Sequence, residues 1–369
     1  MRILALEPYY GGSHKAFLDG WSATGRHRWS ILSLPPFKWK WRMRHAAVTF
    51  ARQVERQLAE GLRPDLLLCS DMLNLAEFVG LAPKSIRDLP RIVYFHENQL
   101  TYPVRCESER DYQFAMTNMT TALAADAVWF NSAFHRDSFL HALEALLNRM
   151  PDYRPTEAVQ HIADKSEVRP PGVFPLPDRQ SRLPGPLRIL WAARWEHDKN
   201  PDDFFAAIEQ LQDRCVRFRI SAIGEQFREV PEVFARARRQ FADRIDRWGY
   251  QQTRADYEAA MLEADVFVST VVHEFFGLSA VEASLAGAYP LVPNRLAYPE
   301  IFGPCSGATG NFLYDGTPAN LATRLADLAA RTEETGSLLE STETLRNRLK
   351  RFEWQHLAPT LDDAAERFQ

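Results

Sequence analysis

Residues 266–282 read VFVSTVVHEFFGLSAVE, a short apolar run that ends in a glycine turn. The run is almost continuously hydrophobic, which predicts a strand covered on both faces. The residues after Gly277 have the pattern of a helix, and the outward-facing amides of Gly277 and Leu278 would form a weakly positive end. Glu274 and Glu282 flank this turn, and two vicinal hydroxyls could bind the Glu282 carboxylate. The plainer alternative is an amphipathic helix with one solvated glutamate.

The same alternation of strand and helix continues in both directions from this stretch. Short apolar runs predict strands and the longer patterns between them predict helices. The predicted strands are 2–6, 29–34, 65–70, 91–95, 127–130, 188–193, 218–223, 266–270 and 289–292. The predicted helices are 46–61, 111–125, 132–148, 202–214, 230–242, 253–264 and 318–330.

A proline-rich segment, residues 149–187, interrupts the alternation. We interpret it as a linker that contains one strand near 167–169. The chain is then an α/β protein with two doubly wound, Rossmann-like domains, residues 1–180 and 181–369. The two domains are expected to face each other across a cleft, with ligands bound where the strands end.

The composition of the 369 residues is that of a globular chain, with 46% hydrophobic and 25% charged residues, which excludes collagen, coiled coils and wholesale disorder. No apolar run approaches the roughly 18 residues of a membrane-spanning helix, and the first residues resemble a strand rather than a signal peptide. A slight basic excess in the first half predicts that any anionic macromolecule binds there. Four cysteines without pair or metal spacing predict reduced thiols of a cytoplasmic protein: Cys69, Cys106, Cys215 and Cys305.

Arg194 and Lys199 follow the predicted strand 188–193 and precede a predicted helix. A βα loop at this place should face the cleft. The planar guanidinium of an arginine and the compact ammonium of a lysine together suit a diphosphate. The alternative is an exposed loop whose charges form salt bridges.

Two other loops also follow predicted strands. His96 comes directly after the strand 91–95. A lone histidine is more often structural than catalytic, but its position at the predicted cleft makes it a candidate. The other loop turns into a helix and consists of Gly11, Gly12, Ser13 and His14. It lacks the full dinucleotide-binding pattern, so it gives only weak support to a nicotinamide cofactor. It would place small backbone and the Ser13 hydroxyl at the mouth of the cleft, near a phosphate or an acceptor.

Residues 36–45 read PFKWKWRMRH and interleave cations with aromatic rings. In an extended stretch the cations would share one face and the large apolar side chains the other. Cations for phosphates and rings for unpaired bases are what recognition of an RNA loop requires. The same pattern suits a protein on an anionic membrane surface. A third interpretation is a basic loop whose rings fold into the core.

Taken together, these motifs resemble the family-4 retaining glycosyltransferases of the GT-B fold, over nearly the whole chain. The features that carry the resemblance are the Gly-Gly loop, Pro170-Pro171-Gly172-Val173, Arg194-x4-Lys199 and Glu274-x7-Glu282. Three further segments are similar to the tRNA-queuosine mannosyltransferase group, which adds mannose to queuosine of tRNA-Asp. They are LEPYYGGSH at 6–14, FHENQ at 95–99 and FNSAFH at 130–135.

The resemblance implies a role for each candidate. The residues implied in catalysis are His96, at the sugar near its anomeric centre, Arg194 and Lys199, at the donor diphosphate, and Glu274, at the hydroxyls of the transferred sugar. Those implied in donor binding are Gly277 and Leu278, through their amides, and Glu282, at the ribose. Those implied on the acceptor side are Gly11, Gly12, Ser13 and His14, while the residues expected to contact an RNA acceptor are Lys38, Lys40, Arg42 and Arg44.

The activity implied is that of a retaining hexosyltransferase that moves mannose from GDP-mannose to queuosine in tRNA-Asp, in the cytoplasm and without stable membrane insertion. No cofactor is expected beyond the nucleotide sugar, which is a co-substrate. No metal is expected either, because the chain has no Asp-x-Asp pair to hold a divalent ion on the diphosphate. The alternatives are a family-4 enzyme that acts on a lipid or glycan, and a non-catalytic protein that binds a nucleotide sugar.

Overall fold

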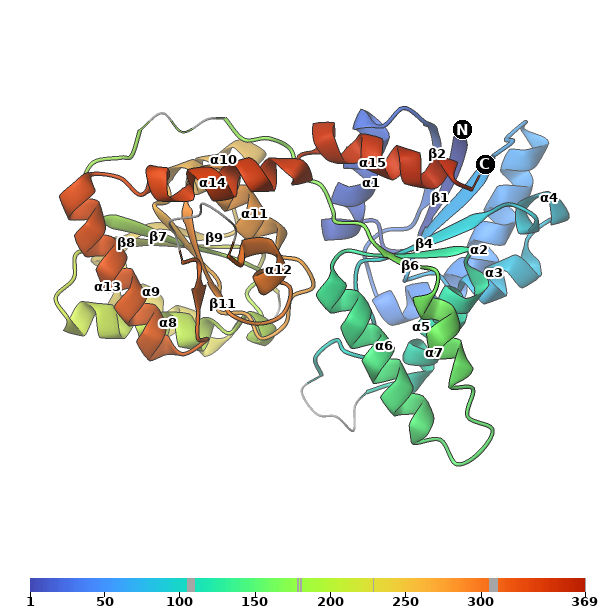
Figure 1. Cartoon of the computed structure of the whole chain (residues 1–369), viewed down its shortest axis with the longest axis horizontal. Helices are drawn as coiled ribbons and strands as arrows, with labels where there is room; N and C mark the ends of the chain where they lie inside the picture. The colour runs from blue at the N-terminus through green and yellow to red at the C-terminus, as the bar shows by residue number, and fades with distance from the viewer. Residues whose placement is uncertain (105–109, 178, 180, 228, 305–310, 369) are drawn as a thin grey trace. The chain divides into compact units, whose positions relative to one another are not determined.

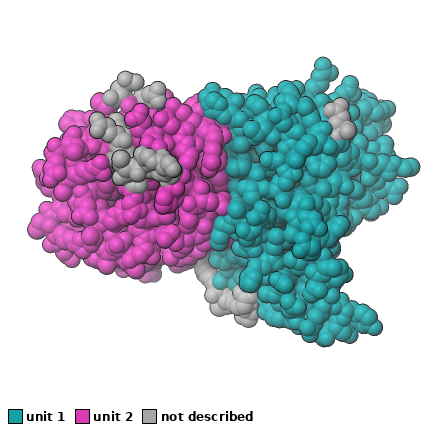
Figure 2. Space-filling view, in the orientation of Figure 1, with its two compact units in different colours: residues 1–172, 354–369 teal, residues 173–353 magenta. Residues whose placement is uncertain are grey.

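The computed structural model describes residues 1–368 apart from 105–109, 178, 180, 228 and 305–310. The chain forms two compact units, coloured separately in Figure 2. Unit 1 contains Met1–Gly172 and Trp354–Gln369, and unit 2 contains Val173–Glu353. Two of the four cysteines, Cys106 and Cys305, lie outside the described residues, and Cys69 and Cys215 are free thiols.

Unit 1 is built on a parallel sheet in the order β2-β1-β3-β4-β5-β6. Its strands are β1 (Arg2–Glu7), β2 (Arg28–Ser33), β3 (Leu66–Ser70), β4 (Arg91–Phe95), β5 (Ala127–Phe130) and β6 (Ser166–Val168). Because the side chains of a strand alternate between the two faces, Leu4 and Leu6 enter one core while Ile3 and Ala5 enter the other. Both faces of the sheet are therefore covered.

The helices of unit 1 divide between these two cores (Figure 1). One face is covered by α1 (Gly12–Thr24) and α15 (Trp354–Glu366). The other face is covered by α2 (Trp39–Ala59), α3 (Leu75–Leu81), α4 (Lys84–Arg87), α5 (Tyr112–Ala124), α6 (Ala133–Asn148) and α7 (Glu157–Ala163).

Unit 2 repeats this architecture with a sheet in the order β12-β11-β10-β7-β8-β9. The strands are β7 (Leu187–Ala192), β8 (Phe218–Ile223), β9 (Ile245–Gly249), β10 (Val266–Val268), β11 (Tyr289–Pro293) and β12 (Leu313–Tyr314). The helices are α8 (Pro201–Asp213), α9 (Glu232–Gln240), α10 (Arg254–Glu263), α11 (Leu278–Leu285), α12 (Tyr298–Phe302), α13 (Pro318–Thr335) and α14 (Leu339–Leu349). Helix α8 packs against α9 and α13, and α11 packs against α10 and α14. The prediction of two doubly wound α/β domains is confirmed.

Two details of the predicted organisation are wrong. The segment 149–187 is not a linker throughout, because α7 packs in the core of unit 1. The strand predicted near 167–169 is confirmed as β6, the edge strand of the sheet. Residues 354–369 were expected in the second domain, and the structure places them in unit 1. Among the described helices, none is long and apolar enough to cross a membrane.

Helix α15 returns to unit 1 because Trp354 fits between two glycines. A Cβ atom on Gly20 would lie 2.1 Å from the Trp354 ring, and one on Gly172 would lie 2.4 Å from it. The Trp21 indole also donates a hydrogen bond of 2.8 Å to the buried Asp362 carboxylate. Figure 1 shows α15, in red, beside α1. The second face of the sheet is thus completed by the last helix of the chain.

We expect Gly20→Ala to lower the free energy of unfolding of unit 1 by roughly 1–3 kcal/mol, the usual cost of an overpacked core. The measurement is urea unfolding followed by tryptophan fluorescence. Gly80→Ala in α3 is the matched control, because a Cβ there meets nothing within 4 Å. This change should be neutral or stabilising by up to about 1 kcal/mol, since alanine favours helix. Equal stability of the Gly20→Ala variant and the natural chain would contradict the packing.

Candidate active site

Lys199 is a buried cation at the carboxyl end of the sheet of unit 2. It ends a short 3₁₀ turn (His197–Lys199) between β7 and α8. Its Nζ atom donates to the His273 carbonyl at 3.1 Å and lies 3.1 Å from Oδ2 of Asp198 and 3.5 Å from Oε2 of Glu274. The structure therefore brings together Lys199 and Glu274, which the sequence placed in separate motifs.

Arg194 emerges from the same βα connection and is far more exposed. Its side chain is 43% exposed and pairs with Glu196 at 3.3 Å. Arg194 and Lys199 both act electrostatically on His273. Burial, and then the positive charge of Lys199, lowers the pKa of His273 to about 4, so this imidazole is neutral near pH 7. The sequence analysis assigned no role to His273, although it directly precedes Glu274.

The glycine turn before α11 has the backbone that the sequence predicted. Gly277 has a φ of 98°, in the left-handed region that favours glycine. A Cβ atom there would lie 2.7 Å from the buried Tyr298 ring, so the position excludes a side chain for two independent reasons. The amides of the first helical turn point outward from α11 and leave a local positive end. This end suits an anion next to the cations of the β7–α8 loop.

Glu282 lies in α11, and its carboxylate is held by two residues of α10. Tyr257 donates to Oε2 at 2.6 Å, and Arg254 lies 3.4 Å from Oε1. Burial raises the pKa of Glu282, and these two donors oppose that shift. Neither Tyr257 nor Arg254 was singled out in the sequence, since a pattern within one segment does not reveal which helix packs against it.

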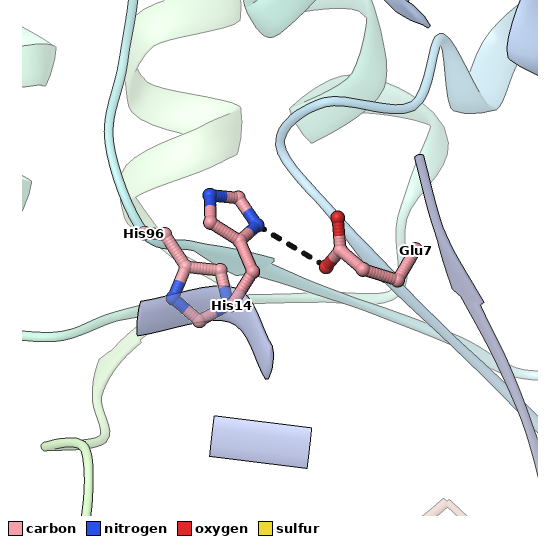
Figure 3. A group of neighbouring side chains, drawn as sticks. All are labelled: Glu7, His14 and His96. Atoms are coloured by element: carbon pink, nitrogen blue, oxygen red, sulfur yellow. Dashed lines mark ion pairs between the residues drawn. The ribbon is translucent and has the colours of Figure 1, made fainter. Parts of the chain in front are cut away.

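Unit 1 carries a second cluster of polar side chains where its strands end (Figure 3). Glu7 ends β1, His14 lies in the first turn of α1, and His96 follows β4. Nδ1 of His14 lies 3.2 Å from Oε2 of Glu7, and the rings of His14 and His96 pack against each other, tilted by 32°, with centroids 4.0 Å apart. All three side chains are buried. The structure thus brings His14 and His96 together and adds Glu7, which had no predicted role.

The fold holds the backbone of His96 from two sides. The backbone amide of His96 donates to Oδ1 of the fully buried Asp71 at 2.8 Å, and the side-chain amide of Asn131 donates to the His96 carbonyl at 3.0 Å. The Gly-Gly turn brings His14 into place, and the turn is itself packed closely, because a Cβ on Gly11 would lie 2.5 Å from Pro36. Gly12 has a φ of 53°, and Ser13 is exposed.

Burial and charge act in opposite directions on these groups. Burial disfavours a charge on His14, but Glu7, with smaller contributions from Asp71 and Glu97, raises the pKa of His14 to about 9. Burial, and then the charges of His14 and His135, hold the pKa of His96 well below its usual range. Burial also raises the pKa of Asp71. A charged His14 therefore packs against a neutral His96 near pH 7.

Glu7, His14 and His96 each offer a ligand atom, and these atoms lie within 4.8 Å of one another. Three such donors are the set of a catalytic zinc site. A metal ion lies in the plane of each imidazole that binds it, whereas these two rings stack with an interplanar angle of 32°. A metal would also have to displace the proton that Glu7 holds on His14. The arrangement suits an ion pair under a stacked ring better than it suits a metal.

The basic aromatic segment is helical, and the prediction of an extended stretch there is wrong. Helix α2 begins at Trp39, seven residues before the predicted start. Met43 is buried in a small apolar cluster with Trp39, Met72 and Phe114. The hydrophobic ring and thioether contacts of that cluster favour the helix over the strand. The side chains therefore follow a period of 3.6 rather than alternating.

The exposed part of this segment still combines cations with rings. Phe37 and Trp41 are each 61% exposed. Lys40 and Arg44, four residues apart, share one side of α2, and both are exposed. Lys38 is exposed as well, while Arg42 is half-buried and donates to the Pro35 carbonyl.

Comparisons with known proteins find relatives for both units. Residues 2–173 match the family model "tRNA-queuosine alpha-mannosyltransferase N-terminal", and residues 186–331 match "Glycosyl transferases group 1". The chain is 38% identical over 312 residues to a tRNA-queuosine alpha-mannosyltransferase of Drosophila melanogaster, covering 81% of each chain. It is 25% identical over 309 residues to a GDP-mannose-dependent alpha-(1-6)-phosphatidylinositol dimannoside mannosyltransferase of Mycobacterium tuberculosis (strain H37Ra), covering 83% of this chain and 74% of that one.

Among solved structures, Anabaena HepE in complex with UDP matches with a TM-score of 0.68 and 15% identity, covering 100% of both chains. A likeness at this identity shows the fold alone, which is the GT-B glycosyltransferase fold. The identity to the Drosophila protein extends over both units and is high enough to show descent. The protein is a glycosyltransferase, and the chain belongs to the tRNA-queuosine alpha-mannosyltransferase family.

Proposed function

We propose that this protein transfers mannose from GDP-mannose to queuosine in tRNA, with retention of configuration at the sugar. The observation that carries the proposal is the 38% identity to the Drosophila tRNA-queuosine alpha-mannosyltransferase over 81% of each chain. The GDP-mannose dependence named for the mycobacterial relative supports the choice of donor. The acceptor is tRNA-Asp, and the protein acts in the cytoplasm.

Unit 2 binds the donor in this proposal. Arg194, Lys199 and the amides of Gly277 and Leu278 hold the diphosphate, since cations and a helix N-terminus both favour an anion. Glu282 accepts hydrogen bonds from the ribose, and Glu274 accepts them from the hydroxyls of the transferred sugar.

The reaction breaks the bond between the anomeric carbon of the sugar and the diphosphate oxygen. A new bond forms on the same face between that carbon and a hydroxyl oxygen of queuosine. The hydroxyl proton passes to the leaving diphosphate, so no pair of protein carboxylates of the kind used by glycosidases is required. Negative charge grows on the diphosphate in this step, where Arg194 and Lys199 stabilise it most.

Unit 1 binds the acceptor in this proposal. His96 contacts the sugar near its anomeric centre, and the residues Gly11, Gly12, Ser13 and His14 lie on the acceptor side. The exposed cations and rings at the start of α2 contact the tRNA, with cations on phosphates and rings on unstacked bases.

The experiment that tests the function compares sugar transfer to tRNA-Asp with and without queuosine. We expect labelled mannose in tRNA that contains queuosine and none in unmodified tRNA. A parallel reaction offers a phosphatidylinositol mannoside in place of tRNA. Transfer to the lipid, with none to the modified tRNA, would replace the proposed acceptor with a glycolipid.

Changing Lys40 and Arg44 together to alanine should weaken tRNA binding. Each phosphate contact to single-stranded nucleic acid contributes about 0.7 to the slope of log affinity against log salt, so the slope should flatten by about 1.4. The matched control is Lys84→Ala with Arg87→Ala in α4, which removes the same charge from exposed positions before β4. An unchanged slope in the α2 variant would place the tRNA elsewhere on the protein.

Arg194→Ala should lower kcat by roughly 10²–10³-fold, the usual effect of removing one preorganised donor to a developing anion. Folding should be unaffected, because the Arg194 side chain is 43% exposed and its ion pair with Glu196 is a surface pair. The measurement is turnover at saturating donor, with thermal unfolding as the check on folding. Turnover like that of the natural enzyme would remove Arg194 from the donor site.

Transfer should continue in EDTA, because side-chain cations and a helix end take the place of a divalent ion at the diphosphate. Loss of activity in EDTA that Mg²⁺ or Mn²⁺ restores would contradict this.

GDP at about 100 times its dissociation constant should stabilise the fold by roughly 2.7 kcal/mol, seen as a higher melting temperature. An equal or larger shift with UDP would exclude GDP-mannose as the preferred donor.

A further inference from the structure

The ring of His96 is packed tightly by other aromatic rings. Phe17 and Tyr94 lie against it with centroids 5.4 and 4.6 Å away, and the His14 ring stacks on it at 4.0 Å. Among the residues that the structure describes, none forms a hydrogen bond with the His96 ring nitrogens. The ring is thus fixed in orientation, with its nitrogens available to a ligand.

The His14 ring, which packs against His96, is itself held by the Glu7 carboxylate. Glu7 pairs with Nδ1 of His14 at 3.2 Å, and its other oxygen accepts from Ser70 Oγ and from the Tyr9 amide. A cavity of about 10 Å³, room for about one water molecule, is lined by Glu7, Ser70 and His96 together with apolar side chains. Glu7 is therefore held by protein donors and can act as a fixed counter-charge.

The charged groups around the two histidines come from several elements. His14 faces Glu7 at the end of β1, Asp71 after β3 and Glu97 after β4. His96 faces the charges of His14 and of His135 from α6. The carboxylates therefore favour a charge on His14, and the charge of His14 acts against a charge on His96.

We propose that Glu7 and His14 are positioning residues for His96. Their ion pair makes the His14 ring a charged support, which fixes the plane of the His96 ring and keeps its nitrogens uncharged for hydrogen bonds to the transferred sugar. This inference rests on the proposed function, because it takes the sugar contact of His96 from it.

The charges of His14 and His96 should determine how activity depends on pH. The pKa of His14 is raised to about 9, so the support keeps its charge throughout the range from pH 6 to 8. Protonation of His96 beside that charge is disfavoured, and its pKa lies well below the usual range. The natural enzyme should therefore lose no activity to histidine protonation as the pH falls from 8 to 6.

The first experiment reads the charge of each ring without substrate. Isotope-labelled histidine, followed by NMR between pH 5 and 10, should show His14 charged up to about pH 9 and His96 neutral at pH 6 and above. The two signals are identified by their loss in His14→Gln and His96→Gln variants. A His14 that titrates near 6.5, or a His96 charged at pH 6, would overturn the proposal. Because this measurement needs no acceptor, it stands apart from any failure of the tRNA assay.

The second experiment measures kcat/KM against pH for the Glu7→Gln variant. Without the carboxylate, burial favours a neutral His14, and His96 becomes easier to protonate. The acid limb should move to higher pH, and a shift of one unit would lower the activity at pH 6 about tenfold relative to that at pH 8. A Glu7→Gln enzyme whose profile matches that of the natural enzyme would refute the positioning role.

The double variant Glu7→Gln with His14→Gln guards against a folding defect, because it leaves no unpaired buried charge. It should show the same shift of the acid limb as His14→Gln alone, since Glu7 acts through His14. An additional loss from the second change would show that Glu7 acts directly. The control is Asp126→Asn, which removes the ion pair with Arg91 at the opposite end of β4 and should leave the profile unchanged.

Discussion

A parallel sheet has to be covered on both faces, and in unit 1 this requirement determines the path of the whole chain. Helix α1 alone leaves much of one face open, and the missing cover comes from α15, after the chain has passed through all of unit 2. Trp354 is fully buried in a space that exists only because Gly20 and Gly172 have no side chains. Folding of unit 1 therefore depends on residues more than three hundred positions apart.

The strands were predictable because their signal is local. A short continuous apolar run identifies a strand buried on both faces, and every predicted strand coincides with an observed one to within two residues at its ends. Strands β9 and β12 were not predicted, and both lie at an edge of their sheet, where fewer apolar residues are needed. The alternation of cations and rings at 38–44 led to a wrong prediction, because a contact with a distant segment decides the structure there. Its period of two fits a strand, but burial of Met43 against Phe114 favours a helix.

The partners of the predicted site residues could not be derived in the same way. Gly277 and Glu282 belong to one local motif, whereas Tyr257, which holds the Glu282 carboxylate, lies on another helix. Asp71 holds the His96 amide from the end of a neighbouring strand. Adjacent parallel strands place such residues together, but the order of the strands in the sheet is needed to know which ones meet.

The two cations proposed at the diphosphate, Arg194 and Lys199, differ in burial and in the ion pairs that hold them. Arg194 is 43% exposed and makes a surface ion pair with Glu196, of a kind that contributes about 0–1 kcal/mol. Lys199 is buried between Asp198, Glu274 and a carbonyl, and moving it would break its ion pairs with two half-buried carboxylates. In the proposed donor site, Lys199 thus orients Glu274 as well as facing the diphosphate, and Arg194 is the more exposed of the two cations.

The carboxyl ends of the two sheets have the same architecture but carry different charges. In unit 2 this edge presents Arg194 and the start of α11, which favour an anion. In unit 1 it presents Glu7 and Glu97 around one charged histidine, while burial raises the pKa of Asp71, so this edge offers no excess of positive charge to a phosphate. The basic residues of unit 1 stand instead at the start of α2. If tRNA is the acceptor, its phosphates are held at α2, and only the uncharged hydroxyls of the modified base are left to approach His96.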